Sequence, residues 1–488
     1  MVEPELSAAP FHDWNARITA ECYAPNAAPR KEIPGGVREL PSNYARMSFN
    51  FGPTLLAWLE PNAPGAYGAI LEADRESRHR FAGHGSAIAQ AYSHMILPLA
   101  NARDRETQVL WGIADFRRRF GRAPEGMWLP EAGVDTETLE TLARHGLRFT
   151  VLSPQQAARM RPIGQNDWEE IRGGRTERRP AQVLLPSGRR LAVFFYDGPL
   201  SQAIAFGLLG DGPTRLAERF SSLFSETEEP QLVHVATDGE TYGHHHRGGE
   251  VVLAETFEEI ESRDTARLTN YGEFLEIAPP VDEVEIVEGS SWSCPHGLKR
   301  WQGECNCQTG LHPEWSQSWR APLREALDWL RDELASRCER HAAPLLTDFW
   351  AARNDWISVL LDRRPEVLED FLARHASRAL TEPEREAAVR LLEIQRHAML
   401  MFTSCGWFFD DPAGLETGIV LRFAGRAIEL AAGAFGEDLE PPFRERLERV
   451  RSNRPEHEHG SRIYEAAVAP YRARLGERPM PPLTPASI

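Results

Sequence analysis

Short apolar runs that resemble β-strands alternate with helix-like runs before about residue 280 of this 488-residue chain. The strand-like runs are residues 45–51, 149–152, 182–185, 191–196 and 231–237. Strands separated by helical segments usually pair as parallel neighbours, because each crossover helix returns the chain to the same end of the sheet. The pattern therefore predicts an α/β fold built on a parallel sheet or barrel.

Acidic residues follow three strand-like runs in this region. Glu131 follows the run 127–130, Asp197 follows 191–196 and Asp238 follows 231–237. Barrel enzymes gather catalytic groups at the carboxyl ends of strands, so three acids in equivalent places predict an active site. A pair of such carboxylates is what glycosidic bond cleavage needs. A lone acid more often caps a helix, and for Asp197 the N-cap explanation stays open beside substrate binding.

The second half of the chain has helical periodicity. Leu, Ala, Arg and Glu recur at helical spacing with Pro or Gly between the runs; the expected helices are 321–341, 343–361, 365–375, 382–402, 414–433 and 441–452. We therefore expect a barrel catalytic domain over 1–280, a Cys/Trp-rich loop segment over 281–315, a helical domain over 316–475 and a tail over 476–488.

The charge and hydropathy of the chain exclude several classes of partner. The formal net charge is −17, which repels nucleic acid and anionic membrane but not a neutral polymer such as a glucan. No run approaches eighteen consecutive apolar residues, and the N-terminus has neither the basic nor the apolar region of a signal peptide. We expect a cytoplasmic protein with no membrane span, and the sequence does not indicate its oligomeric state.

Three sequence motifs carry a resemblance to a known family. The stretches Trp128-Leu129-Pro130-Glu131 and 238–244 (DGETYGH) resemble the third and fourth signature regions of glycoside hydrolase family 57, and 83–99 resembles the second. The remainder is similar to a bacterial subgroup with a long helical C-terminal domain of unassigned function. The stretches 292–294 (WSC) and 405–411 (CGWFFDD), and Trp301, are typical of that subgroup.

The resemblance implies an incomplete seven-stranded β/α barrel and a retaining double displacement on α-glucan or oligosaccharide. Glu131 would be the nucleophile and Asp238 the acid/base, and this chemistry requires no cofactor. Hydrolysis and transfer both remain open, because the choice depends on how well loops exclude water. The residues expected to bind substrate are His84, His94, Trp128, Asp197, Glu240, His244, Trp292 and Trp407.

The beginning of the chain departs from the family pattern. Family 57 proteins normally open with a strand carrying a His-x-x-Gln-Pro type motif, whereas here the stretch 11–18 already lies close to Met1. We expect the first barrel strand to be missing, through a start assigned too far downstream or through real loss of the strand. In the second case, the chain would be a catalytically impaired carbohydrate-binding or regulatory protein on the same scaffold.

Two further patterns have alternative explanations. The run His244-His245-His246 allows a metal-dependent sugar hydrolase or deacetylase, although consecutive residues make poor joint ligands, and contacts with sugar hydroxyls or with Asp238 fit better. The tryptophans, Trp14 and Trp301 among them, can stack on sugar rings, but a core role explains any single one at least as well.

Three cysteines and a histidine lie within fourteen residues. Cys294, His296, Cys305 and Cys307 form the right ligand set for tetrahedral zinc, although the spacing is not that of a standard zinc knuckle. A structural zinc therefore stands beside two alternatives, namely reduced thiols in a loop and a disulfide from Cys294, which a reducing cytosol disfavours. The other cysteines, residues 22, 338 and 405, are expected to be singly buried thiols.

Overall fold

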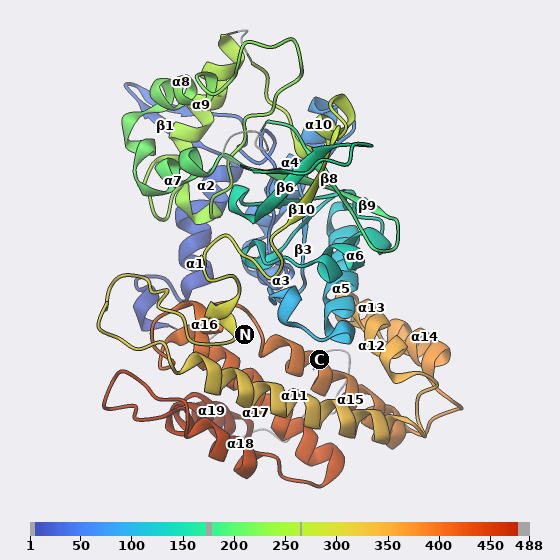
Figure 1. The fold of residues 1–488 in the computed structure, drawn as a ribbon. Helices are drawn as coiled ribbons and strands as arrows, with labels where there is room; N and C mark the ends of the chain where they lie inside the picture. Colours follow the sequence, from blue (N-terminus) through green and yellow to red (C-terminus); the bar gives the residue numbers. More distant parts are fainter. Residues whose placement is uncertain (1–4, 172–177, 264–265, 477–488) are drawn as a thin grey trace. The chain divides into compact units, whose positions relative to one another are not determined.

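The computed structural model describes residues 5–171, 178–263 and 266–476. The chain divides into two compact units (Figure 1), and both are discontinuous in sequence. The first comprises residues 1–90, 119–128 and 135–288; the second comprises 91–118, 129–134 and 289–488. The domain boundaries expected from the sequence remain a prediction.

The first unit is an α/β structure. Its strands are β1 Arg30–Ile33, β2 Gly36–Glu39, β3 Ala89–Gln90, β4 Met127–Trp128, β5 Phe149–Leu152, β6 Ala157–Pro162, β7 Glu169–Glu170, β8 Ala181–Leu184, β9 Arg190–Phe195 and β10 Asp282–Ile286. Its helices are α1 Trp14–Ile18, α2 Ala24–Ala27, α3 Pro53–Asn62, α4 Pro64–Arg80, α6 Thr136–Arg144, α7 Gly198–Phe206, α8 Pro213–Ser221, α9 Gly249–Ser262 and α10 Tyr271–Ile277. The predicted α/β class is confirmed for this part of the chain.

Parallel extended segments lie side by side through the first unit. Phe49 bridges Ala87 in parallel, β3 pairs with β4, Gly126 bridges Phe149, and β5 pairs with β9. Just beyond β9, the Asp197 N–H donates to the His234 carbonyl over 2.9 Å. The carboxyl ends of β4, β5 and β9 therefore share one direction, as the placement of acids after strand-like runs assumes.

A larger mixed sheet extends from the same strands. Its order is β5-β9-β8-β10-β6-β7, in which β9 pairs with β8 antiparallel and β8 pairs with β10 parallel. All four residues of β5 are buried, and Phe149, Phe194 and Phe195 are at most 1% exposed. This burial explains why these strands read as continuous apolar runs rather than as alternating ones.

Two of the expected strands are not regular strands in the structure, so these predictions are wrong. Residues 45–51 contribute only the bridge at Phe49, and residues 231–237 form no regular strand. The second stretch is held at separate points, with the Leu232 N–H donating to Arg178 and the His234 carbonyl accepting from Asp197. Apolar, β-branched residues favour extended backbone there, but too few ladder hydrogen bonds form to make a strand.

The second unit is helical, and the expected C-terminal helical region is confirmed. It contains most of α5 Ala102–Phe120 together with α11 Arg320–Ala342, α12 Phe349–Asp355, α13 Ile357–Leu361, α14 Pro365–His375, α15 Glu382–Leu400, α16 Cys405–Phe408, α17 Leu415–Phe435, α18 Glu440–Leu447 and α19 Gly460–Gly476. Helices α11, α15 and α17 pack on one another (Figure 1). Their core includes Trp319, Trp356 and Trp407, each at most 1% exposed.

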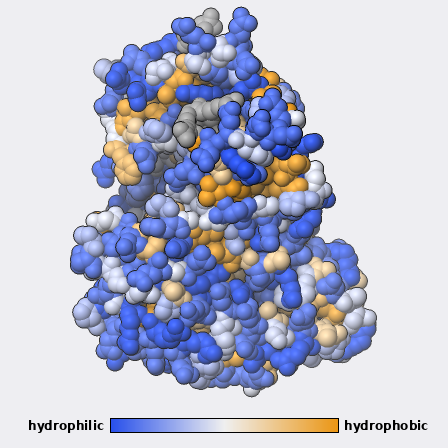
Figure 2. All heavy atoms as spheres, in the orientation of Figure 1, coloured by the Kyte–Doolittle hydropathy of each residue, from blue (hydrophilic) through white to orange (hydrophobic). Residues whose placement is uncertain are grey.

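The one long helix expected over 343–361 is wrong, because α12 and α13 divide it. Asp348 caps α12, and its carboxylate accepts hydrogen bonds from the N–H groups of Trp350 and Ala351. None of the described helices has the length and apolar character of a bilayer span. Over α11, α17 and α18, the face shown in Figure 2 is mainly hydrophilic with scattered apolar side chains.

Candidate active site

Glu131 sits in a turn directly after β4, in the segment 129–134 that belongs to the second unit. Its φ of 57° and that of Ala132, 49°, lie in the left-handed region, which costs a residue with a Cβ about 1 kcal/mol or more. The Glu131 carbonyl accepts from the Trp292 N–H over 3.0 Å. The strained turn is thus fastened to the segment around residue 292.

Two side chains hold the same oxygen of the Glu131 carboxylate. The Ser293 hydroxyl donates to Oε2 over 2.6 Å, and the Trp292 indole N–H donates to Oε2 over 3.1 Å. Within the described residues, no hydrogen bond reaches Oε1. The carboxylate is therefore oriented through one oxygen while the other is available to react.

Cys405 lies near this carboxylate in the second unit, and His94 contacts the preceding residue, Ser404. Burial and the Glu131 charge raise the pKa of Cys405 to about 12, which keeps this thiol protonated at neutral pH. The residue as a whole is exposed, so the expectation of a buried residue is wrong, although its sulfur is desolvated by the atoms packed around it. The neighbouring Ser404 hydroxyl pairs with His94 Nδ1 at 2.7 Å, and the Ser404 N–H donates to the His94 carbonyl.

Asp238 begins a short loop of the first unit and has an exposed side chain. Its charge contributes, after burial, to raising the pKa of Tyr196 at the end of β9. That electrostatic effect places Asp238 close to the carboxyl end of β9. Glu131 and Asp238 belong to different units.

The loop after Asp238 is fastened to the first helices of the chain. The Tyr23 hydroxyl donates to Glu240, and His244 Nδ1 contacts Glu21 Oε2 at 2.6 Å, which lowers the pKa of Glu21. Gly243 has a φ of 135°, and a Cβ there would lie 2.2 Å from the Glu21 carbonyl oxygen. Only glycine permits this close approach.

The histidine run does not gather metal donors. His244 contacts Glu21, and His246 Nε2 donates a hydrogen bond to the Ala205 carbonyl over 2.8 Å. Within residues 5–171, 178–263 and 266–476, none of these three histidines belongs to a cluster of three or more side chains that could hold a metal ion. The structure therefore offers no support for a metal-dependent hydrolase or deacetylase at these histidines.

Asp197 serves as a helix cap. Its carboxylate accepts from the Leu200 N–H over 2.8 Å, and its side chain is nearly buried. This hydrogen bond satisfies one of the unpaired donors at the start of α7, which is the capping explanation left open by the sequence. Asp197 nevertheless marks the carboxyl end of β9, beside Tyr196.

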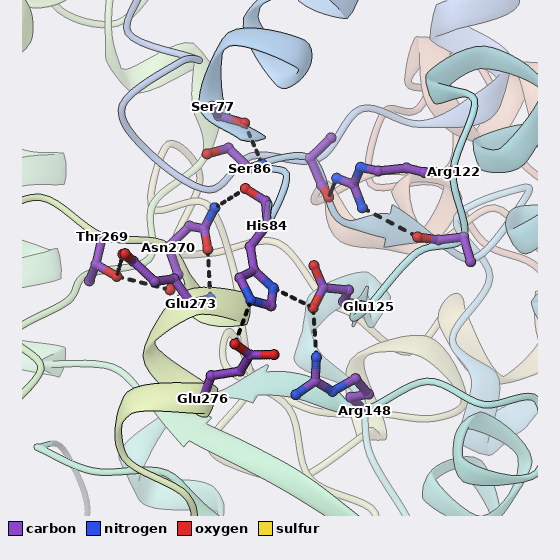
Figure 3. Close-up of polar contacts among 12 residues, drawn as sticks. Ser77, His84, Ser86, Arg122, Glu125, Arg148, Thr269, Asn270, Glu273 and Glu276 are labelled. Atoms are coloured by element: carbon purple, nitrogen blue, oxygen red, sulfur yellow. Dashed lines mark hydrogen bonds and ion pairs between the residues drawn. The ribbon is translucent and has the colours of Figure 1, made fainter. Parts of the chain in front are cut away.

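His84 lies at the opposite end of the parallel strands. It follows α4, and its Nδ1 contacts Glu125 Oε2 at 2.8 Å while its Nε2 lies 3.2 Å from Glu276 Oε2 (Figure 3). Glu125 precedes β4, and Arg148, which precedes β5, donates to the same Glu125 oxygen over 2.9 Å. This network ties the amino ends of two strands to α10, whereas substrate in a barrel enzyme binds at the carboxyl ends.

The three tryptophans expected to contact substrate differ in burial. Trp128 and Trp292 are partly exposed, whereas Trp407 is 1% exposed, stacks on Phe402 and donates its indole N–H to the Arg320 carbonyl over 3.3 Å. The expectation that Trp407 binds sugar is corrected, because a ring packed in the helical core offers no face to a ligand. Trp301 is also 1% exposed.

Cys294, His296, Cys305 and Cys307 converge in the second unit. One donor atom from each lies within 4.8 Å of the other three. The cysteines are free thiols, and burial together with the neighbouring Cys294 raises the pKa of Cys307 to about 12. The cluster is compatible with a structural metal.

Several partners in these arrangements escape sequence reasoning. Ser293 and Trp292 contact Glu131 from more than 160 residues away, and Tyr23 reaches Glu240 across 217 positions. The pairing of His84 with Glu125 spans 41 residues. None of these pairs has a local spacing signal, since each depends on how the chain returns to the same place.

Two family models match the chain. Residues 79–287, which include Glu131 and Asp238, match glycosyl hydrolase family 57, and residues 315–477 match a domain of unknown function (DUF3536). These matches confirm the family resemblance seen in the motifs. Residues 288–314, which contain the cysteine cluster, lie between the two matched segments.

Individual relatives are distant. The chain is 23% identical over 198 residues to Alpha-amylase 1 of Dictyoglomus thermophilum, which covers 40% of this chain and 26% of that protein, so it matches about a quarter of this curated relative. The crystal structure of an exo-type maltose-forming amylase from Pyrococcus sp. ST04 has a TM-score of 0.65 at 16% identity, covering 96% of this chain and 86% of that one. An alpha-amylase structure from Thermotoga maritima gives 0.50 at 14% identity, covering 84% and 78%. The structural matches establish a shared fold.

Proposed function

We propose that this protein is a glycoside hydrolase or glucanotransferase that acts on α-glucan, because residues 79–287 match the model of glycosyl hydrolase family 57. The Dictyoglomus thermophilum and Pyrococcus sp. ST04 proteins described above are amylases by name, which supports an α-glucan substrate. We also infer that the parallel segments of the first unit, from Phe49 through β9 to His234, belong to an incomplete seven-stranded barrel. The side-by-side hydrogen bonding of these segments supports that inference.

The proposed reaction is a retaining double displacement. Glu131 attacks the anomeric carbon, the glycosidic C–O bond breaks, and Asp238 gives its proton to the departing oxygen. Water or a sugar hydroxyl then attacks the glycosyl-enzyme ester, returns a proton to Asp238 and releases Glu131. Such a mechanism needs the two carboxyl groups about 5 to 5.5 Å apart, and none of its steps passes through a metal.

The observation that supports this proposal most strongly is the way in which the Glu131 carboxylate and backbone are held. A carboxylate held on Oε2 by Ser293 and Trp292 keeps a fixed orientation, and a nucleophile must be held in a near-attack geometry to react efficiently. Its backbone in the left-handed region is the kind of local strain that gathers at functional sites. A glutamate that merely satisfied a turn would need neither feature.

Several further side chains are proposed to contact substrate. Trp128 and Trp292 are partly exposed aromatic rings flanking Glu131 in sequence or by contact, and such rings stack on the apolar faces of glucose. Glu240 and His244 follow Asp238 and are positioned by Tyr23 and Glu21. His94 is proposed to contact substrate from the second unit.

The test uses purified full-length protein with maltooligosaccharides and glycogen. Glu131→Gln and Asp238→Asn should each abolish the change in chain length, and Glu137→Gln, an acid in the first turn of α6, should not. The anomeric configuration of the first product, followed by NMR, should match that of the substrate. Inverted product would refute double displacement, and full activity in Glu131→Gln would refute the assignment of the nucleophile.

A further inference from the structure

We propose that Cys294, His296, Cys305 and Cys307 bind one zinc ion and that this zinc fixes the segment that orients Glu131. The first half of the proposal concerns metal binding alone, whereas the second half rests on the proposed function. The cluster and Glu131 both belong to the second unit.

The donor atoms already have the spacing of a tetrahedral site. Cys294 Sγ lies 3.6 Å from Cys307 Sγ and 4.0 Å from Cys305 Sγ, and Cys307 Sγ lies 3.4 Å from His296 Nδ1. Zinc–sulfur bonds of about 2.3 Å at tetrahedral angles separate two sulfurs by about 3.8 Å. Zinc therefore fits among these atoms with small side-chain adjustments.

The backbone near the cluster is folded for this convergence. Gly297 follows His296 with a φ of 76°, and a Cβ there would lie 2.5 Å from the Gly289 carbonyl oxygen, so the turn requires glycine. The Gly297 N–H donates to the Cys294 carbonyl over 3.1 Å, and the Ser291 hydroxyl donates to the Gly297 carbonyl over 2.8 Å. These bonds turn His296 back towards the thiols.

Two buried guanidinium groups lie beside the cluster. Arg320 is fully buried, and its Nη1 lies 3.6 Å from Cys305 Sγ and donates to the Cys307 carbonyl over 3.0 Å. Arg300 is 4% exposed and donates to the Ser293 carbonyl. In the described part of the chain, neither arginine forms an ion pair with a carboxylate, and the Nε of each is buried without a partner.

The charge of a metal-bound cluster would compensate these cations. Three thiolates, one neutral histidine and Zn²⁺ sum to a single negative charge, because each thiol gives up its proton on binding. The Asp410 charge favours charged Arg320, and Arg300 lies over the Phe408 ring. Burial of a cation nevertheless costs several kcal/mol, so neutral thiols leave both arginines incompletely compensated. A negatively charged zinc site explains why two arginines are buried next to these sulfurs.

The site also has a path for the ion. Cys294 and Cys305 are buried, but Cys307 is partly exposed and His296 is exposed. Zinc can therefore enter from the His296 side and be shielded by the two inner thiolates. This arrangement fits a structural site with four protein ligands and no open coordination position.

The cluster is joined directly along the chain to the two residues that hold Glu131. Ser293 and Trp292 immediately precede Cys294, and both hydrogen-bond the Glu131 carboxylate. Cys307, Pro313 and Trp315 lie in a stretch with almost no helix or strand, residues 302–319, whose backbone has few regular hydrogen bonds of its own. Zinc would tie that stretch to Cys294 and so hold Trp292 and Ser293 in place.

The first experiment measures metal directly. Wild-type protein purified under reducing conditions and dialysed should carry about one zinc per chain by elemental analysis. After the zinc is removed, cobalt should restore the site and give the absorption of tetrahedral thiolate-bound Co²⁺. Cys307→Ser should weaken zinc binding by more than the roughly 10- to 100-fold typical of losing an outer partner, whereas Cys338→Ala, which removes a buried thiol on α11, should not.

Clear outcomes overturn the metal site. Native protein that holds no zinc and whose metal-free form fails to bind cobalt refutes it, as does a Cys294–Cys305 or Cys294–Cys307 disulfide that persists under the conditions of purification. The cobalt titration uses the wild-type chain, so the conclusion stands even if Cys307→Ser does not fold.

The second experiment tests the positioning role. Metal-free, reduced enzyme should lose about 10- to 100-fold in kcat with little change in KM, since a misplacement near 1 Å costs about that much, and added zinc should restore the rate. Glu131→Gln should be inactive yet keep its zinc. Unchanged kcat without zinc refutes positioning, whereas a zinc-bound protein that transforms no α-glucan refutes the proposed function and leaves the metal site intact.

Discussion

The hydrogen bond from Ser293 to Glu131 is predicted to be needed for full activity. Replacing Ser293 with Ala removes the 2.6 Å donor to Oε2 and leaves the Trp292 donor at 3.1 Å. A hydrogen bond to a charged group contributes about 1.5 to 3 kcal/mol. Each 1.4 kcal/mol is a factor of ten in an equilibrium or a rate. The preference of the carboxylate for the held orientation over other orientations therefore falls about 10- to 100-fold.

Two effects oppose each other in this variant. Loss of a donor makes the remaining carboxylate more nucleophilic, which raises the rate, whereas loss of orientation lowers it. Water can replace the missing hydroxyl at this partly exposed position, which restores part of the first interaction but not the fixed direction. We therefore expect the orientation effect to win, and kcat of Ser293→Ala to fall about 10-fold with little change in KM.

The assay is steady-state release of product from maltooligosaccharides, with zinc content measured on the same samples. Ser293→Thr retains the hydroxyl and should keep most of the wild-type rate, and Trp292→Phe, which removes the longer bond, should lose less than Ser293→Ala. Because both donors bind the same oxygen, the loss of kcat in the double variant should differ from the sum of the two single losses, expressed as free energies. Ser293→Ala with wild-type or higher kcat would refute the positioning argument, even if Glu131→Gln is inactive.

Three predictions concern stability and are measured by chemical or thermal unfolding. The buried Arg353–Asp104 ion pair, 2.7 Å between Nη1 and Oδ1, predicts a loss of about 3 to 5 kcal/mol in Asp104→Asn; a loss below 1 kcal/mol would contradict it. Burial lowers the pKa of His234 from 6.5 to about 3, so its protonation favours the unfolded chain and stability should fall as the pH drops from about 6.5 towards 3, by at most about 1.4 kcal/mol per pH unit. His234→Gln should show a shallower loss, and an identical pH profile would argue against this origin. His84→Ala should lower stability by about 1 to 3 kcal/mol through its two carboxylate contacts, with the exposed His79→Ala as control; unchanged stability with a raised KM would instead restore the substrate-binding role.

Local signals in the sequence predict much of the secondary structure. Asp135 caps α6, with its carboxylate accepting from the Thr138 N–H over 2.7 Å, which is the role that Asp before an apolar helical run commonly takes. Helix α14 begins and ends at the expected residues, Pro365 and His375, because Pro at the first helical position fixes its start. The start of α12 at Phe349 is not apparent from the apolar pattern, because Asp348 acts as a helix cap inside an otherwise continuous apolar stretch.

The site is predicted less completely, because its contacts are long-range. The acid after β4 can be recognised from its strand-end position, but the donors that orient it come from residues 292 and 293, which carry no spacing relation to Glu131. His84 lies in the stretch that resembles a family signature region and is expected to bind substrate, yet it lies with Glu125 and Glu276 at the amino ends of the strands. A family motif identifies positions under constraint without saying whether the constraint is catalytic or structural.

The placement of Glu131 gives the helical half of the chain a part in the proposed chemistry. Residues 129–134 leave the parallel segments after β4 and group with residues 289–488 in the second unit. The Val134 N–H donates to the Ser290 carbonyl, and the Trp292 N–H donates to the Glu131 carbonyl, so the turn is held at both ends by one segment. Cys405, within the segment that matches a domain of unknown function, has its pKa raised in part by the Glu131 charge. The proposed nucleophile thus depends for its orientation on Trp292 and Ser293, which lie outside the segment that matches glycosyl hydrolase family 57.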